Sequence, residues 1–257
     1  MDHFNDTTCE FNPARFYHPQ SAQARATVGV SACLTGQPVR YDGRDRYLPA
    51  IELLATALRL TPICPEVGAG LTVPRPPVQL IASRSDSQPS ARGRDDSSLD
   101  VTQKLLDFAH LSVARAAAQS ALCGYLWKSR SPSCGFNSTP LFDESGTQIG
   151  QTSGIQAAHF QRAMPWLSYC EELTLIDRLT ALAFVLRCRL IFDWMYAGDV
   201  ELLAQHRHYR FLIDRLPHSD QIAVDEFAKA NHKVNYLTAL QHGCAGLQSE
   251  QLLELFI

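Results

Sequence analysis

The chain has 257 residues, of which 46% are hydrophobic and 19% charged, and its formal net charge is -3. That length can bury a sizeable core, so we expect one larger domain with a smaller companion. The near balance of charge excludes a strongly basic DNA-binding protein and leaves RNA binding to a local patch. No stretch approaches the roughly 20 apolar residues that cross a bilayer, and the N-terminus lacks the apolar core of a secretory signal. We therefore expect a soluble, cytoplasmic protein with neither a membrane nor DNA as partner.

The first third of the chain predicts a polar arm followed by strands and a helix. Residues 1–26 are polar and show no clear periodicity. VGVSAC, Val28 to Cys33, predicts a short buried strand that runs into a loop rich in glycine and proline. Leu48 to Leu60 has the spacing of a helix, and Thr61 to Cys64 predicts a second strand. Both predicted strands end in a cysteine.

The alternation continues over the middle of the chain. The predicted elements are a strand over 79–83, an exposed, mobile loop over 83–99, a helix over 100–121, a strand over 122–128, a helix over 154–164 and a strand over 166–170. Strands that alternate with helices imply a mainly parallel sheet with helices on both faces. We therefore predict a Rossmann-like α/β domain over residues 27–172.

From about Glu172 onward the pattern is helical only. Apolar stripes over 173–196, 201–216 and 226–241 predict a small all-helical domain at 173–257, a candidate RNA-binding unit. It is slightly acidic, with eight Lys and Arg against ten Asp and Glu. Its basic side chains form either one RNA-binding surface or ordinary solvated helix faces; they are Arg187, Arg189, Arg207, Arg210, Lys229 and Lys233.

Three of the eight cysteines share a context. Cys33 and Cys64 each end a predicted strand, and Cys134 lies in the loop after the strand over 122–128. Loops at the carboxyl ends of parallel strands converge, so the three thiols are expected to meet. Three thiolates suit a zinc site with an open position or an iron–sulfur cluster with one iron free of cysteine. The alternative is that they are small buried hydrophobes, which is the interpretation for Cys123, Cys170 and Cys188; Cys9 and Cys244 have no partner in spacing.

The sequence resembles the thiouracil desulfurases of the TudS type. The stretches that carry the resemblance are SACLTGQPVRYDG (Ser31 to Gly43), CPEVGAGLTVPRPP (Cys64 to Pro77), DVT (Asp100 to Thr102) and KSRSPSCG (Lys128 to Gly135). The resemblance implies a [4Fe-4S] cluster held by Cys33, Cys64 and Cys134, with the fourth iron open to the substrate's sulfur. It also implies a catalytic carboxylate and a catalytic serine, which map onto Glu66 and Ser131.

The chemistry expected of such a site is hydrolytic and involves no net redox change. Coordination of a thiocarbonyl sulfur to iron makes the adjacent carbon more electrophilic. Glu66 could then accept a proton from an attacking water, and Ser131 could donate a hydrogen bond to the substrate or position the water. A glutamate after a proline could instead be a solvated or helix-capping residue.

Several neighbours of these residues are candidates for substrate binding. They are Arg40, Tyr41, Asp42, Arg75, Ser129 and Ser133. Arginine suits planar contacts with a base or a phosphate, although the charged members could equally form internal salt bridges. The candidates for a local basic surface near the site are Arg84, Arg92, Arg94, Lys128 and Arg130.

The helical domain directs the substrate assignment. In the family resembled here, a two-domain form with a C-terminal helical domain is associated with 4-thiouridine in transfer RNA (tRNA). We therefore expect a desulfurase, or desulfidase, that converts 4-thiouridine in tRNA to uridine and hydrosulfide. The alternatives are an enzyme for free 2-thiouracil or a thiouridine nucleoside, a non-enzymatic iron–sulfur or redox sensor, and a scaffold in which the thiols are merely packed.

Overall fold

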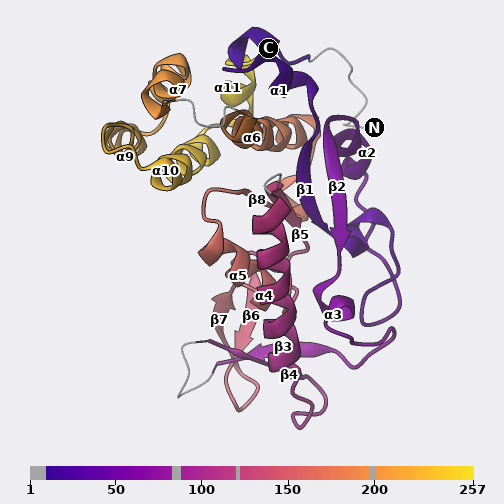
Figure 1. The fold of residues 1–257 in the computed structure, drawn as a ribbon. Coiled ribbons are helices and arrows are strands. Elements are labelled where there is room, and N and C mark those ends of the chain that lie inside the picture. Colours follow the sequence, from indigo (N-terminus) through magenta and orange to yellow (C-terminus); the bar gives the residue numbers. More distant parts are fainter. Residues whose placement is uncertain (1–9, 83–87, 120–121, 197–200) are drawn as a thin grey trace.

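The computed structural model describes residues 10–82, 88–119, 122–196 and 201–257 (Figure 1). Two parts of the predictions lie outside the described residues: residues 1–9 of the predicted arm, which include Cys9, and Arg84. At the centre is a parallel sheet with strand order β2-β1-β5-β8. Its strands are β1 (Ala26–Ser31), β2 (Leu58–Ile63), β5 (Leu122–Trp127) and β8 (Ser168–Glu171). The predicted parallel α/β architecture is confirmed.

Helices cover both faces of this sheet, as predicted. On one face, α2 (Ala50–Ala57) and α6 (Arg178–Tyr196) pack against apolar side chains of β1 and β5. On the other, α4 (Thr102–Gln119) and α5 (Ile155–Ala163) enclose Tyr125 and Trp127. Gly29 of β1 leaves room for the Tyr125 ring, which a Cβ at that position would overlap.

A second sheet lies at the far end of the α/β region (Figure 1). Its order is β4-β3-β6-β7, and its strands are β3 (Val78–Ile81), β4 (Ser90–Gly93), β6 (Thr139–Phe142) and β7 (Gln148–Thr152). The prediction of an exposed loop over all of 83–99 was wrong at β4, where Ala91 is fully buried. The sequence analysis also missed β6 and β7, because β7 is mostly exposed and has no alternating apolar pattern.

Two predicted helix boundaries were wrong for identifiable reasons. The helix over 48–60 ends at Ala57, because Leu58 pairs with Ala26 and starts β2. The helix over 226–241 is two helices, α9 (His218–Lys229) and α10 (Lys233–Gly246), which are separated where Asn231 has a φ of 56°. A left-handed residue interrupts a right-handed helix.

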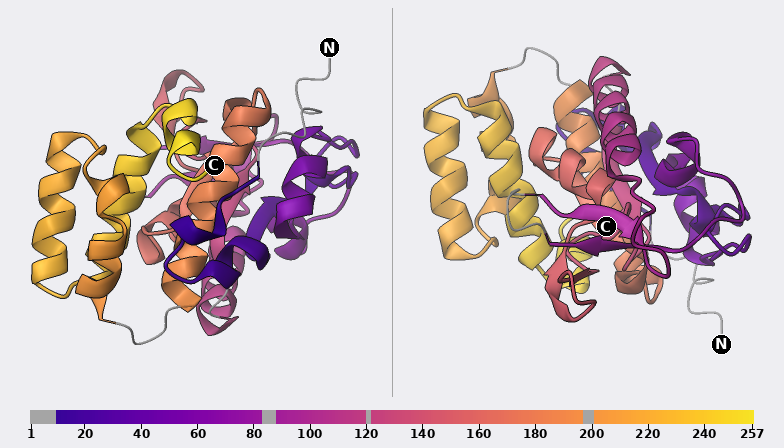
Figure 2. Two further views of the ribbon diagram at one scale, coloured as in Figure 1. Left: turned by 90° about the horizontal axis from the view of Figure 1, so that it is seen from above. Right: turned by 90° about the horizontal axis from the view of Figure 1, so that it is seen from below.

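The C-terminal helices lie to one side of α6, away from the main sheet (Figure 2). Besides α9 and α10 they are α7 (Leu202–His208), α8 (Arg210–Ile213) and α11 (Ser249–Glu254). One side of α6 packs with them through Leu186, Leu190 and Trp194, and the other side packs on the sheet. Among the described helices, none is both long and apolar enough to cross a bilayer.

The described part of the N-terminal arm is not free of structure. It forms a short 3-10 helix, Pro13–Arg15, and α1 (Pro19–Gln23). Phe16 is 1% exposed and belongs to the core of the helical region. The carboxylate of Asp193 on α6 accepts hydrogen bonds from the backbone N–H groups of Tyr17 and His18. The described part of the arm, from residue 10 onward, therefore packs on the helical region.

Candidate active site

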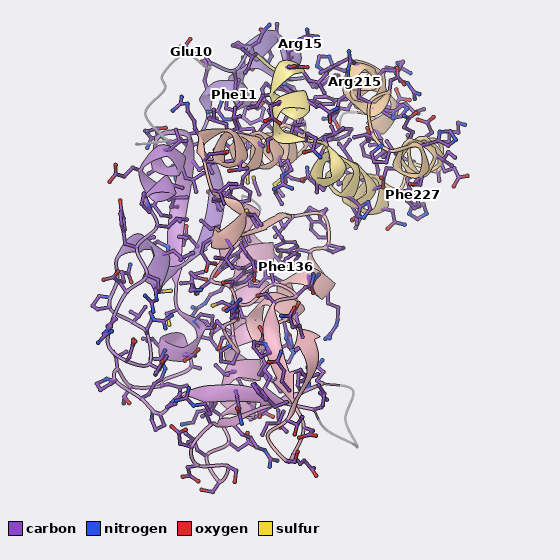
Figure 3. The ribbon with its side chains drawn as sticks, turned by 180° about the vertical axis from the view of Figure 1, so that it is seen from behind. Glu10, Phe11, Arg15, Phe136, Arg215 and Phe227 are labelled. Carbon is purple, nitrogen blue, oxygen red and sulfur yellow. The ribbon has the colours of Figure 1, made fainter. Side chains whose placement is uncertain are left out.

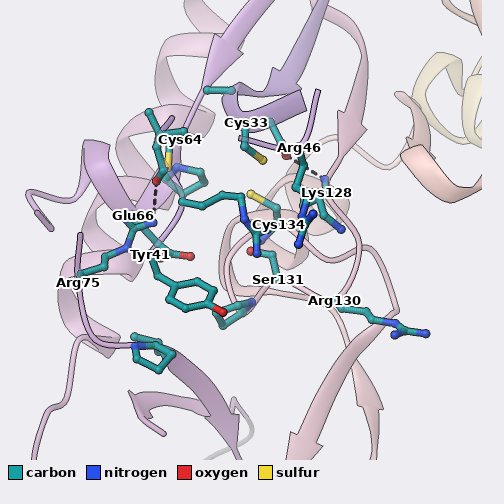
Figure 4. Close-up of a pocket in the computed structure, with 18 of the residues that line it drawn as sticks. Cys33, Tyr41, Arg46, Cys64, Glu66, Arg75, Lys128, Arg130, Ser131 and Cys134 are labelled. Atoms are coloured by element: carbon teal, nitrogen blue, oxygen red, sulfur yellow. Dashed lines mark hydrogen bonds and ion pairs between the residues drawn. The ribbon is translucent and has the colours of Figure 1, made fainter. Parts of the chain in front are cut away.

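Three cysteines meet at the carboxyl ends of three strands of the main sheet. Cys33 follows β1, Cys64 follows β2 and precedes the short helix α3 (Pro65–Gly68), and Cys134 lies in the loop after β5. All three line one cavity of about 310 Å³. Figure 4 shows the sulfur atoms of Cys33 and Cys134 on one side of this cavity and that of Cys64 on the other. The convergence predicted from the strand ends is present.

The three thiols are free and mostly buried. None forms a disulfide, and Cys33 and Cys134 are 8% and 6% exposed. Burial raises the pKa of Cys33 to about 11, and burial also raises the pKa of Cys64 and of Cys134. The next largest causes lower the pKa, through Arg40 at Cys33 and a hydrogen bond with Ser31 at Cys134, but burial outweighs them. Without a bound cation the three groups are therefore neutral thiols at neutral pH.

The donor set fits an iron–sulfur cluster better than a single metal ion. Among the residues described, no three His, Cys, Asp or Glu side chains lie close enough to hold one ion. The ligands of a cluster bind different irons, so their sulfur atoms need not converge as they do around zinc. Three soft thiols around a shared cavity are the ligands that such clusters use.

Glu66 is fixed in the wall of the cavity by two partners. Its Oε2 accepts a hydrogen bond from Arg75 Nε at 2.7 Å, and its Oε1 accepts one from Ser133 Oγ at 3.1 Å. Arg75 also donates to the carbonyl oxygen of Val39 at 3.0 Å, and its side chain is 6% exposed. Arg75 therefore forms the internal ion pair that the sequence left open, and Ser133 lies behind Glu66, outside the cavity lining.

Ser131 and Ser129 both line the cavity, but the hydroxyl of Ser129 is bound to a carboxylate. The Oγ of Ser131 accepts hydrogen bonds from the N–H of Ser133 at 3.3 Å and of Cys134 at 3.1 Å. Its own hydroxyl proton can therefore be donated into the cavity. Ser129 is 3% exposed, and its Oγ donates to Glu172 at 2.7 Å.

The cavity lining is basic. Its cationic residues are Arg40, Arg46, Arg75, Arg94, Lys128 and Arg130, and Glu66 is its one acidic member within the described part of the chain. Ion pairs join Arg40 to Asp42, Arg94 to Asp95 and Lys128 to Glu172. Arg46 and Arg130 have no acidic partner among the described residues, and Arg130 extends away from the cysteines (Figure 4).

The remaining predicted residues are close to the cavity. Tyr41 lines it and is 37% exposed, with the guanidinium of Arg40 5.6 Å from its ring centre. Asp42 is exposed and outside the lining, where it contacts Arg40. The sequence analysis missed Arg46, whose backbone N–H donates to the carbonyl of Cys33 at 2.9 Å. It also missed Ser31, whose Oγ accepts from the N–H of Lys128 at 2.9 Å.

Comparisons with known proteins point to one family. The family model of 2-thiouracil desulfurase matches residues 28–172. The uncharacterised protein YbbK of Bacillus subtilis (strain 168) is 31% identical over 139 residues, which are 52% of this chain and 89% of YbbK. A solved structure of TudS, described as a [4Fe-4S]-dependent thiouracil desulfidase, is 30% identical with a TM-score of 0.48 and covers 62% of this chain and 99% of its own. The helical region from residue 173 onward lies beyond the family match.

Proposed function

Because this chain belongs to the 2-thiouracil desulfurase family, we propose that it is an enzyme that removes the sulfur atom from a thiolated uracil. The reaction replaces a C=S bond by a C=O bond: water supplies the oxygen, sulfur leaves as hydrosulfide, and no electrons are exchanged. The observation that supports it most is the cavity that three free thiols share with the partly buried carboxylate of Glu66, whose side chain is 13% exposed. Its volume of about 310 Å³ is sufficient for a pyrimidine ring.

In this proposal Cys33, Cys64 and Cys134 would hold a [4Fe-4S] cluster. When bound, the cluster would supply a Lewis-acidic iron without a protein ligand, which can bind the soft sulfur of the substrate. Binding requires the three thiols to lose their protons, because thiolates are the metal ligands. Arg40 and Lys128, whose charges lower the pKa of Cys33 against the larger effect of burial, favour its ionised form.

Glu66 and Ser131 would have different roles in proton transfer. The carboxylate of Glu66, held by Arg75 and Ser133, would accept a proton from the attacking water. Ser131, whose oxygen already accepts two backbone N–H groups, would donate its hydroxyl proton to the substrate or to that water. Because both side chains are held by hydrogen bonds, they need little rearrangement when a substrate binds.

The substrate we propose is 4-thiouridine within tRNA. The support is the basic lining, because Arg46 and Arg130 have no acidic partner in the described part of the chain, and cations attract the phosphates that a free base does not have. The helical region gives less support to an RNA substrate, because two of its arginines are not available to bind phosphates. Arg189 is only 8% exposed, and Arg210 is paired with Asp214 and Asp225. The alternative is a free 2-thiouracil or a thiouridine nucleoside.

The test compares substrates on the reconstituted full-length protein. We expect hydrosulfide release from 4-thiouridine-containing tRNA at low micromolar concentration and much slower release from 2-thiouracil or 4-thiouridine. Equal rates with the free base would refute the tRNA assignment. Bound iron with no hydrosulfide from any of the three would instead support the sensor alternative and refute the enzyme.

A pair of matched variants tests the phosphate argument. Arg46→Ala should raise KM for the tRNA about tenfold, since one charge-assisted contact to phosphate is lost, and should leave kinetics on free thiouracil unchanged. Arg59→Ala, which removes an exposed arginine outside the cavity lining, is the control. An identical loss in both variants would mean that general charge, not the cavity lining, attracts the RNA.

A further inference from the structure

Two carboxylates that no sequence motif indicated hold the loop that carries Cys134. The first is Glu172, which follows β8 and binds the residues at the start of this loop. Its Oε2 accepts the backbone N–H of Ser129 at 2.7 Å, and its Oε1 accepts both Ser129 Oγ at 2.7 Å and Lys128 Nζ at 2.5 Å. Glu172 therefore binds the backbone and both side chains of the first two loop residues.

The second carboxylate, Glu171, binds the other end of the same loop. Its Oε1 accepts the backbone N–H of Phe136 at 2.6 Å and the hydroxyl of Ser138 at 2.5 Å. Ser138 Oγ in turn accepts the N–H of Arg130 at 2.9 Å. We call Glu171 and Glu172 together the carboxylate clamp.

The register of the main sheet explains why adjacent residues reach both ends of the loop. β8 runs parallel to β5, with Glu171 opposite Trp127. The loop leaves β5 directly after that pair, so Glu172 lies beside its first residues. Glu171 is the last residue of β8 and binds the returning part of the loop, whereas Glu172 begins the 3-10 helix that follows.

The loop needs such restraint because part of its backbone is unfavourable. Arg130 has a φ of 58°, in the left-handed region that residues with a Cβ avoid. N–H groups at the start of α5 bind the tip of the loop, with Ile155 donating to Pro132 O and Gln156 to Ser133 O. The two ends are held by the clamp. Without it, Arg130 keeps its hydrogen bond to Ser138, but Ser138 and Ser129 on either side of the strained residue lose their carboxylate partners.

We infer that Glu171 and Glu172 are positioning residues that keep Cys134 and Ser131 in place at the cavity. The inference rests on the proposed function only in taking Cys134 as a ligand and Ser131 as a catalytic group. The clamp also lies where the helical region begins, because Glu172 opens the 3-10 helix Glu172–Thr174 that leads to α6. A cavity of about 360 Å³ between the two regions is lined by Glu171, Phe136 and Arg187, and Figure 3 shows Phe136 on that side.

The test measures thiol reactivity in the full-length chain before iron is added. N-ethylmaleimide is applied for short times, and the alkylated peptides are quantified by mass spectrometry. In Glu171→Ala and in Glu172→Ala we expect Cys134 to react about tenfold faster than in the wild type, because two or more hydrogen bonds are lost. Cys123 and Cys188, both 0% exposed in the core beneath α6, should stay as slow as in the wild type. Glu226→Ala, an exposed acid on α9, is the control.

Conservative variants separate positioning from general destabilisation. Glu171→Gln keeps an acceptor for two neutral donors, so Cys134 should react at nearly the wild-type rate. Glu172→Gln keeps an acceptor for Ser129 but loses the charge that pairs with Lys128, so an intermediate rate is expected. After reconstitution, the iron content and kcat should fall as the reactivity of Cys134 rises, with KM for the substrate little changed.

Each outcome of the alkylation experiment either supports or overturns the positioning role of the clamp. Wild-type reactivity of Cys134 in both alanine variants would overturn it. If Cys123 and Cys188 also become reactive, the variant has unfolded as a whole, and Glu172→Gln then decides by whether Cys134 alone reacts faster. If Cys134 reacts faster in the variants but the wild-type protein releases hydrosulfide from no thiolated substrate, the positioning role of the clamp is supported and the proposed function is refuted.

Discussion

Glu66 joins the acid–base chemistry of the site to the loop that carries Cys134, because its two oxygens bind Arg75 and Ser133. Ser133 precedes Cys134, and Glu66 lies two residues after Cys64. The proposed base is thus tied to two of the three proposed ligands. The motifs CPE and SPSC, which looked independent in the sequence, form one hydrogen-bonded unit.

Replacing Glu66 tests the base without disturbing the thiols. In Glu66→Gln we expect iron binding to persist and hydrosulfide release to fall by about 10²–10⁴-fold, the range for loss of a general base. Ser133→Ala removes one restraint on the carboxylate and should cost about tenfold. Rates and iron content of the same preparations are the measurements. A fully active Glu66→Gln protein with its iron retained would rule out the base assignment.

The buried side chain of His159 is expected to make the stability of the folded protein depend on pH. Its Nδ1 donates to Ile155 O at 2.9 Å, so its Nε2 must accept from His110 Nε2 at 3.2 Å. Burial, with smaller contributions from His110 and Arg162, lowers the pKa of His159 below the ordinary 6.5. The native state therefore binds fewer protons than the unfolded state as the pH falls below 6.5, and stability decreases there.

The expected result is a melting temperature that drops as the pH is lowered below about 6.5, and a smaller drop in His159→Gln, which cannot be protonated. The comparison of the two slopes isolates this residue from other titrating groups. Equal slopes would show that the His110–His159 pair does not contribute.

At the scale of elements, the strands that end in the site were the easiest part to predict. The segments of β1 and β5 are short apolar runs bounded by loop residues, and most of their side chains are buried. The strands of the second sheet were harder, because β7 is mostly exposed and β4 lies in a serine-rich, charged stretch. Pairing with β3 makes β4 a strand and buries Ala91 and Gly93, and a single sequence shows neither the pairing nor the burial.

Some features of the site could likewise be predicted from the sequence, and others could not. The cysteines could be placed because parallel strands share a carboxyl edge. The clamp could not, since Glu172 and Ser129 meet only through the pairing of β8 with β5. The status of Arg75 was likewise undecidable from sequence, because an arginine serves a ligand or an internal acid depending on three-dimensional placement.

Helix α3, which carries Glu66, depends on close contact with α4. A Cβ at Gly68 would overlap the ring of Phe108. Gly68→Ala should therefore destabilise the protein by about 1–3 kcal/mol, the usual cost of overpacking, and should slow the reaction by moving Glu66. Phe108→Leu in the same chain should restore much of both. Urea unfolding and hydrosulfide release measure the two effects, and absence of rescue would show that the contact is not the cause.

At the scale of the whole molecule, α6 is the element that the two regions share. Phe184, Val185 and Ile191 face the sheet, whereas Leu190 and Trp194 face the helical core. The predicted boundary between residues 172 and 173 therefore separates the sheet from the helix that covers it. The helical region is a structural part of the α/β fold as well as a candidate contact surface for RNA.

Truncation tests this dependence. A chain of residues 1–172 loses the α6 cover, and each large apolar side chain left in water costs about 1.5–3 kcal/mol. The sum is comparable with the whole stability of a domain, about 5–15 kcal/mol. We expect this fragment to be insoluble alone and to be recovered in soluble form when residues 173–257 are expressed with it. Cooperative unfolding of the fragment alone, at the urea concentration of the full chain, would contradict this.

The contact between the two ends of the described chain affects how the protein is made. Asn12 N–H donates to the carbonyl of Phe256 at 2.6 Å, and the rings of Phe16 and Phe256 lie 5.2 Å apart. During synthesis the segment around Phe16 is made 240 residues before Phe256, its aromatic partner. The contact between the two rings can therefore form only late, after the sheet and the helices that lie between these residues in the sequence have been synthesised.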